Sequence, residues 1–173
     1  MSMKIRSDFV TNSSSSSYIV LFKEANDLED IKKSLSGKII VLGKKGTTVF
    51  TRSYKLSTDF YSKLNFIGLT AWYLQEEDYL KNFMKKTLDC DIDFTKLEKM
   101  QEDFKAFIDH QSIPSKWSNG EDESYTMFHN EKMLKQFLFS DRSFLIMDSD
   151  EYDGEERDKI LTKYAIDEDF IVL

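Results

Sequence analysis

The stretch EEDYLKNFMKKTL, residues 76–88, decides the fold class of this chain. Its apolar positions are 79, 80, 83, 84 and 88, and those of the next segment, 95–109, are 97, 100, 104, 107 and 108. Both sets recur at the 3.6-residue period of an amphipathic helix, so Leu97, Phe104 and Phe107 are expected on one buried face. The link at 89–94 is short and alternates Asp with apolar residues, and it predicts a turn between two antiparallel helices.

Strands are expected on both sides of this helical middle. Upstream, apolar runs rich in β-forming residues predict strands at 18–23, 38–42 and 47–51, with a helix between the first two. Downstream, the pattern predicts a helix at 131–139, a strand at 143–147, a helix at 155–164 and a strand at 169–173, whereas residues 58–74 fit no pattern. The sequence therefore predicts an α+β fold. It is a single domain with a small mixed sheet of about five strands packed with about five helices.

Charge is distributed unevenly along the chain, whose formal net charge is −7. Residues 1–70 carry 11 basic and 6 acidic side chains, whereas residues 71–173 carry 13 basic and 25 acidic ones. The window 31–58 holds seven basic residues and no acid, and the window 141–169 holds eleven acids and four basic residues. This asymmetry predicts two faces of opposite potential, or self-association through them.

The cysteine count and the apolar runs indicate a compartment. Cys90 is the one cysteine, which excludes an internal disulfide framework and favours a reducing environment. No apolar run approaches the roughly 20 residues that a membrane helix needs, and no apolar stretch follows Lys4 and Arg6, so no secretory signal is expected. We expect a cytoplasmic protein without membrane contact. Only four of the 24 basic residues are arginine, so sequence-specific DNA binding is not expected.

The N-terminal residues 4–18 read KIRSDFVTNSSSSSY. This resembles the start of many small, otherwise unrelated proteins of low-GC bacteria and their phages. Those proteins begin with a basic stretch, Phe-Val-Thr/Ser-Asn, a serine run and an aromatic residue. The resemblance covers about 15 of the 173 residues; it implies a bacterial or phage origin and no activity or site residue. By composition, residues 1–17 are a polar, Ser-rich leader or a lead-in to the first strand, and residues 18–173 form the domain.

The segment GKKGTT at 43–48 is the first candidate for chemistry. A phosphate-binding P-loop requires Gly, four residues and then Gly-Lys-Ser/Thr, but Gly37 and Gly43 have five residues between them and Lys45 follows Lys44. The expected role is a solvated hairpin tip, and the alternative is a basic finger that binds phosphates or an acidic partner. The candidate anion-binding residues are Lys38, Lys44, Lys45 and Arg52.

An acidic loop after the predicted strand at 143–147 is the second candidate. Carboxylates at the end of a strand hold Mg²⁺ in many α/β folds, and Asp148-x-Asp150 resembles the nucleophile motif of haloacid-dehalogenase-type phosphatases. That motif normally opens its fold, whereas here 23 residues follow it. A solvated loop is the expected role. As a partner-binding surface, the loop offers Asp148, Asp150, Glu151, Asp153, Glu155 and Glu156.

Two functions of different classes follow from these candidates. The first is a non-enzymatic macromolecule-binding protein, like an inhibitor or an immunity protein, with a protein partner and no cofactor. The second is a Mg²⁺-dependent phosphoester or nucleotide enzyme, in which Asp148, Asp150 and Asp153 bind the metal while Lys44 and Lys45 hold phosphate. We favour binding, because every catalytic pattern tried fails and because the second half of the chain is strongly acidic.

Overall fold

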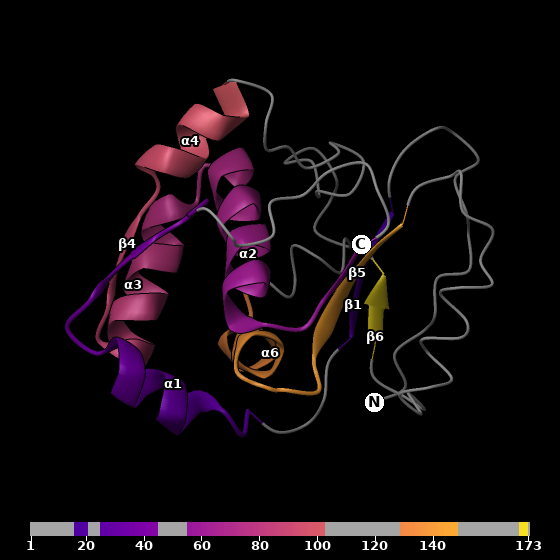
Figure 1. Ribbon diagram of the computed structural model, residues 1–173, viewed down its shortest axis with the longest axis horizontal. Coiled ribbons are helices and arrows are strands. Elements are labelled where there is room, and N and C mark those ends of the chain that lie inside the picture. The colour runs from indigo at the N-terminus through magenta and orange to yellow at the C-terminus, as the bar shows by residue number, and fades with distance from the viewer. Residues whose placement is uncertain (1–15, 21–24, 45–54, 103–128, 149–169, 173) are drawn as a thin grey trace.

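The chain folds into helices and strands in mixed order in the computed structural model (Figure 1), which describes residues 16–20, 25–44, 55–102, 129–148 and 170–172. The helices are α1 (Leu28–Leu35), α2 (Phe60–Leu74), α3 (Glu77–Leu88), α4 (Thr95–Glu102) and α6 (Glu131–Leu138). The strands are β1 (Ser16–Val20), β2 (Ile39–Val41), β3 (Lys55–Ser57), β4 (Asp91–Asp93), β5 (Phe144–Asp148) and β6 (Phe170–Val172).

Four of the strands form an antiparallel sheet in the order β3-β5-β1-β6. Tyr18 of β1 lies opposite Ile146 of β5 on one side and opposite Val172 of β6 on the other. β3 pairs with the other edge of β5, where Leu56 also lies opposite Ile146. Figure 1 shows this sheet to the right of the helices. Because its strands come from residues 16–20, 55–57, 144–148 and 170–172, the sheet joins segments from distant parts of the sequence.

The other two strands, β2 and β4, form a separate parallel pair in which Ile40 lies opposite Ile92. The prediction of one small mixed sheet of about five strands is therefore wrong, because the described strands form two separate sheets and the only parallel pairing among them lies in the two-stranded one. A parallel pair needs a long crossover connection, and here that connection contains α2 and α3. The apolar runs in the sequence identify strands, but they do not record which strands pair with each other.

The residues between α3 and α4 do not form the predicted turn between two helices. Cys90, Ile92 and Phe94 are buried, whereas Asp91 is exposed and Asp93 is partly exposed. This alternation has the two-residue period of a half-buried strand. Asp91 and Asp93 therefore form the outward side of β4, whereas Asp89 ends α3 with a left-handed φ of 53°.

The central helix α2 occupies residues that fit no sequence pattern. Its side chains are buried on several sides at once, including those of Leu64, Phe66, Ile67, Leu69, Ala71 and Leu74. A helix that is apolar all round lacks the single stripe by which amphipathic helices are identified. Asp59 caps its start, because the carboxylate accepts the backbone N–H of Ser62 at 3.0 Å. The end is marked by Gln75, whose φ is 58°.

The predicted helices at 76–88 and 131–139 are confirmed as α3 and α6, and the helix predicted from 95 is confirmed as far as residue 102. Leu97 is buried as predicted, whereas Phe104 and Phe107 lie outside the described residues. The predicted strand at 47–51 and helix at 155–164 also lie outside them. Among the described helices, none has the length and apolar character needed to cross a bilayer.

Aromatic side chains connect the helices in the core. The Phe139 ring stacks on Phe60, with centroids 5.9 Å apart, and on Phe83, with centroids 6.4 Å apart. In α6, Phe137 meets Phe66 of α2 edge to face at 6.4 Å. Residues of α2, α3 and α6 therefore share one apolar core, and this core supports the inner side of β2 through Ile40 and Leu42.

Gly68 allows β2 to lie close to α2. A Cβ at position 68 would lie 2.5 Å from Cδ1 of Leu42, whose side chain is buried. We expect Gly68→Ala to lower the free energy of unfolding by about 1–2 kcal/mol, since overpacking outweighs the better helix propensity of alanine. A urea titration measures this. In a Leu42→Ala background the same change should cost nothing, whereas a stabilising effect in the otherwise unchanged protein would contradict the close contact.

Candidate protein-binding surface

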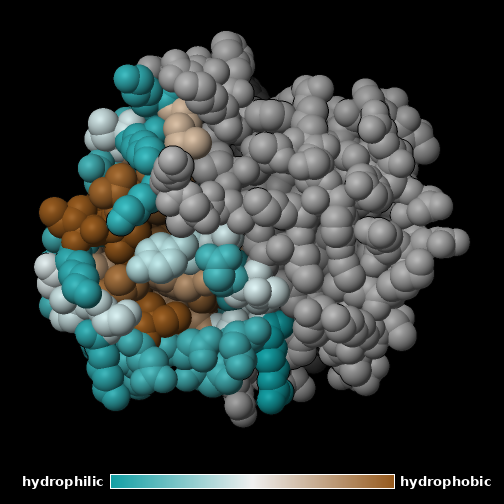
Figure 2. All heavy atoms as spheres, in the orientation of Figure 1, coloured by the Kyte–Doolittle hydropathy of each residue, from teal (hydrophilic) through white to brown (hydrophobic). Residues whose placement is uncertain are grey.

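The outward side of β2 carries two apolar side chains. Ile39 is 68% exposed and Val41 37% exposed, whereas Ile40 between them is 5% exposed. Successive side chains of a strand point to opposite faces, so Ile40 enters the core while its neighbours face solvent. Figure 2 shows apolar residues at the surface on the side where Figure 1 places β2 and β4. Among the large apolar side chains whose burial the structure describes, Tyr61 is also exposed.

The start of β2 is fixed by backbone hydrogen bonds to the residues around β4. Gly37, with a φ of 72°, donates its N–H to the carbonyl of Asp89 at 2.8 Å. The N–H of Asp91 donates to the carbonyl of Lys38 at 3.0 Å. A left-handed φ is readily adopted by glycine, which explains why the chain turns from α1 into β2 at this position.

The end of β2 is fixed in the same way. Leu42 donates its N–H to the carbonyl of Asp93 at 3.0 Å, and Gly43 donates its N–H to the buried Asn65 side chain of α2 at 2.9 Å. Because both ends are bonded and the inner side chains are buried, Ile39 and Val41 are presented on a firmly attached strand.

One edge of β2 is open in the described part of the chain, where this strand pairs with β4 alone. Lys38 and Leu42 direct backbone groups toward β4 through the two bonds given above. Alternate residues of a strand direct these groups to opposite edges, so the N–H and C=O groups of Ile39 and Val41 point away from β4. The open edge therefore combines backbone donors and acceptors with two exposed apolar side chains.

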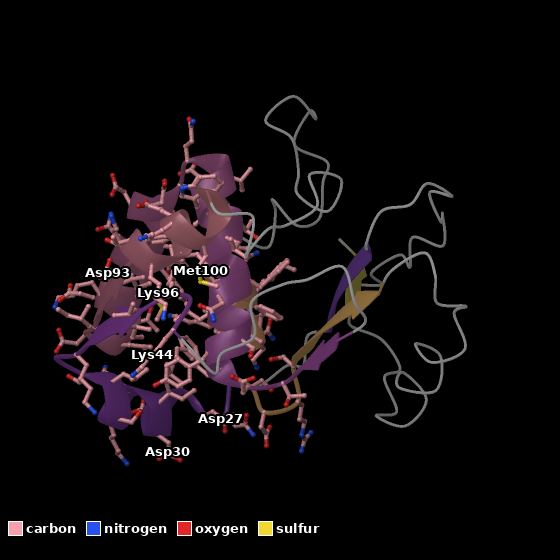
Figure 3. The ribbon with its side chains drawn as sticks, turned by 45° about the horizontal axis from the view of Figure 1, so that its top comes forward. Asp27, Asp30, Lys44, Asp93, Lys96 and Met100 are labelled. Atoms are coloured by element: carbon pink, nitrogen blue, oxygen red, sulfur yellow. The ribbon has the colours of Figure 1, made fainter. Side chains whose placement is uncertain are left out.

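Two of the four predicted anion-binding residues flank this strand. Lys38 directly precedes β2 and Lys44 follows Gly43, and both are exposed. Within the described residues, Lys38 forms no ion pair with an acidic side chain. Figure 3 shows Lys44 in the region of the two-stranded sheet where Asp93 ends β4. Lys45 and Arg52 lie outside the described residues.

The acidic side chains around β4 form ion pairs and hydrogen bonds with other groups of the same chain. Lys85 Nζ lies 3.4 Å from a carboxylate oxygen of Asp89 and 3.6 Å from one of Asp91, and this proximity raises the pKa of Lys85. The Ser36 hydroxyl donates to Asp89 at 2.9 Å and, with Lys85, lowers the pKa of that carboxylate. These carboxylates are therefore partly neutralised.

Asp93 is occupied as well, because its carboxylate accepts the backbone N–H of Thr95 at 2.9 Å. This hydrogen bond is the main reason that the pKa of Asp93 is lowered. On the outward face, the acidic residues of β4 are therefore already ion-paired or hydrogen-bonded within the chain. Apolar side chains lie on β2, and lysines lie at its two ends.

The predicted acidic surface falls mostly outside the described residues. Asp148 is the last residue of β5, where it lies opposite Ser16 of β1. The other members, Asp150, Glu151, Asp153, Glu155 and Glu156, lie outside the described residues, so their role in partner binding stays a prediction. Among the residues that the structure describes, no group of three or more His, Cys, Asp or Glu side chains is placed to hold a metal ion.

Lys63 of α2 is a buried charged residue, 1% exposed, that the sequence reading did not single out. Its Nζ donates to the carbonyl of Ser140 at 2.8 Å, to the carbonyl of Ser143 at 3.2 Å and to the Ser143 hydroxyl at 2.8 Å. Burial lowers the pKa of Lys63 to about 8, against the opposing effect of nearby carboxylates. Because an ammonium has three donors and all three are used, Lys63 joins α2 to the turn before β5 rather than forming a reactive site.

Cys90 is unsuited to nucleophilic chemistry. The side chain is buried, and burial is the main cause that raises the pKa of the thiol to about 11. A thiol is reactive as the thiolate, which this environment disfavours at neutral pH. Among the described residues, the exposed face of β2 is therefore the best candidate for a functional site.

Sequence reasoning missed both Ile39 and Val41 as surface residues. The run from 39 to 42 is entirely apolar, so nothing in it shows which side chains face solvent. For Lys63 a signal exists, since it is the only charged residue between Phe60 and Leu74. An isolated charge in an apolar helix must be hydrogen-bonded when it is buried.

Comparison with protein-family models, with curated protein sequences and with solved structures found no match to this chain.

Proposed function

We propose that this chain is a non-enzymatic binding protein, of the inhibitor or immunity type, that docks on a protein partner through the outward face of β2. The observation that carries the proposal is the exposure of Ile39 and Val41 on a strand bonded at both ends. Fully burying an exposed aliphatic side chain contributes about 1.5–3 kcal/mol, so Ile39, which is mostly exposed, offers much of that amount and Val41, which is already mostly covered, a smaller share.

The distribution of apolar and charged side chains on this surface supports the proposal. Interfaces place apolar side chains at the centre and charged ones at the rim. Here Ile39 and Val41 form the apolar centre, and Lys38 and Lys44 lie at the two ends. We place the protein in the cytoplasm, in line with its single cysteine, and the N-terminal resemblance supports a bacterial or phage origin.

Site-specific crosslinking tests this function in cells of the organism that encodes the chain. A photoreactive amino acid replaces Ile39, and the matched control carries it in place of Lys132, an exposed residue of α6. We expect position 39 to crosslink one protein that position 132 does not. That protein is then identified by mass spectrometry and purified.

Binding to the purified partner provides the quantitative test. We expect the double variant Ile39→Ser/Val41→Ser to stay folded but to bind at least about tenfold more weakly, a loss of about 1.4 kcal/mol. The control is Tyr61→Ser, which removes another exposed large side chain and should leave the affinity unchanged. Equal crosslinking at positions 39 and 132, or full affinity of the double variant, would contradict the proposal.

A further inference from the structure

We infer that the partner presents an extended acidic segment, which adds to the open edge of β2 as a third strand of the β2–β4 sheet. This inference rests on the proposed function and specifies the chemistry of the partner. Two independent properties of the same edge carry it, namely the direction of its backbone groups and the sign of the charge around it.

The backbone groups favour an extended segment over a helix or a folded surface. The N–H and C=O groups of Ile39 and Val41 point away from β4, in the plane of the sheet, as the pairing of Lys38 and Leu42 with β4 requires. An extended chain beside β2 satisfies these groups as a ladder and covers the two apolar side chains. This is the mode by which peptides add a strand to an exposed sheet edge.

The charges favour an acidic segment. Lys38 and Lys44 lie at the two ends of β2, and the window 31–58 that contains them has no acidic residue. The acids beside the sheet, Asp89, Asp91 and Asp93, lie on the β4 side of the pair. Asp89 accepts a hydrogen bond from Ser36 and is paired with Lys85, Asp91 is also paired with Lys85, and Asp93 accepts the N–H of Thr95. The chain as a whole is negative, but screening limits that repulsion beyond about 8 Å at physiological salt.

The same lysines disfavour a second copy of this chain at the edge. Pairing β2 with β2 of another copy would bring Lys38 and Lys44 of both chains to one short edge. Lysines beside an edge strand are a known device against such pairing. The same edge of β2 thus repels a second copy of this chain and attracts a chain of opposite charge.

Designed peptides test the inference with the full-length protein. The first is a blocked seven-residue peptide of alternating Glu and Val, the second replaces each Glu by Lys, and the third is the acidic peptide with alternate backbone amides methylated. Affinity is measured by fluorescence anisotropy at low and high salt. Hydrogen exchange of the Ile39 and Val41 amides reports the position of binding.

We expect the acidic peptide to bind at least about tenfold more tightly than the basic peptide at low salt, with the difference shrinking at high salt. Methylation should weaken binding at least about tenfold, because it removes ladder hydrogen bonds. Saturation with the acidic peptide should slow exchange of the Ile39 and Val41 amides. Equal affinity for the acidic and basic peptides, or protection at another site, would overturn the inference.

Two variants link the result to the edge itself. Val41→Pro removes a donor that points away from β4, so the β2–β4 ladder is retained while the open edge is blocked. Lys38→Glu/Lys44→Glu reverses the local charge, and Lys132→Glu is its control on α6. Both test variants should weaken the acidic peptide at least about tenfold, whereas Lys132→Glu should change its affinity less than about twofold. Unchanged peptide binding by both test variants would contradict strand addition. The inference would also be contradicted if the unaltered protein formed a dimer and Val41→Pro dissociated it, because the edge would then bind a second copy of the chain.

The purified partner separates this inference from the proposed function. If no protein crosslinks at position 39, the proposed function itself fails. If a partner requires Ile39 and Val41 but binds Val41→Pro and Lys38→Glu/Lys44→Glu with full affinity, the binding function stands and strand addition by an acidic segment is wrong.

Discussion

Truncation of Lys63 to alanine is expected to lower the free energy of unfolding by about 2–5 kcal/mol, the range for removing a long buried side chain. The side chain is 1% exposed, and its Nζ provides three hydrogen bonds to Ser140 and Ser143. Its removal leaves a cavity between α2 and α6 and takes a donor from the Ser143 carbonyl. Chemical denaturation of both proteins at neutral pH measures the loss.

Two further variants identify the origin of this loss. Lys63→Met keeps an unbranched side chain of similar length, so it should restore most of the packing but none of the hydrogen bonds. Lys132→Ala removes an exposed lysine of α6 and should change stability by less than about 0.5 kcal/mol. A Lys63→Ala protein as stable as the Lys132→Ala protein would show that the buried lysine does not join α2 to the turn before β5.

The pH dependence of stability is expected to carry the signature of the same residue. Between about pH 8 and 10.5, the free energy of unfolding should rise by about 3 kcal/mol relative to the Lys63→Met protein. The pKa of Lys63 is about 8 in the folded protein and its ordinary value is 10.5. Between these values the unfolded chain holds the proton and the folded chain has lost it, so raising the pH favours the folded state. Below pH 8 both states are protonated, and no slope is expected.

The comparison with Lys63→Met is needed because Cys90 titrates in the same range with the opposite sign. Its pKa is raised from 9.0 to about 11, so the unfolded chain loses the thiol proton first and stability falls as the pH rises. Both proteins contain Cys90, and its contribution cancels in the difference. A difference that is flat from pH 7 to 10.5 would contradict the lowered pKa of Lys63.

Local patterns predicted individual elements better than their arrangement. The 3.6-residue stripes of α3 and α6 are confirmed, because an amphipathic helix records its buried face in the sequence. The central α2 has no such stripe, since it is enclosed on several sides. The alternation at Cys90 and Ile92 was present in the sequence, but the aspartates between them were attributed to a turn. Strand pairing depends on contacts between distant residues, and composition does not encode it.

For the candidate site too, local features were visible in the sequence, whereas features that depend on the tertiary arrangement were not. Lys38 and Lys44 were predicted from a basic window free of acids, because charge is visible in a linear sequence. That Ile39 faces solvent while Ile40 is buried depends on where α2 lies, and a continuous apolar run gives no indication of it. The acidic residues from Asp150 to Glu156 stay a prediction, since they lie outside the described residues.

The parallel pairing of β2 with β4 also constrains the order in which the molecule folds. All of α2 and α3 separates the two strands in the sequence, so the pair closes a long loop and is expected to form late. While the chain emerges from the ribosome, β2 is complete well before residue 91 is synthesised, and during that interval neither of its edges has β4 as a neighbour. A chaperone that binds extended apolar segments would therefore meet β2 before the binding surface exists.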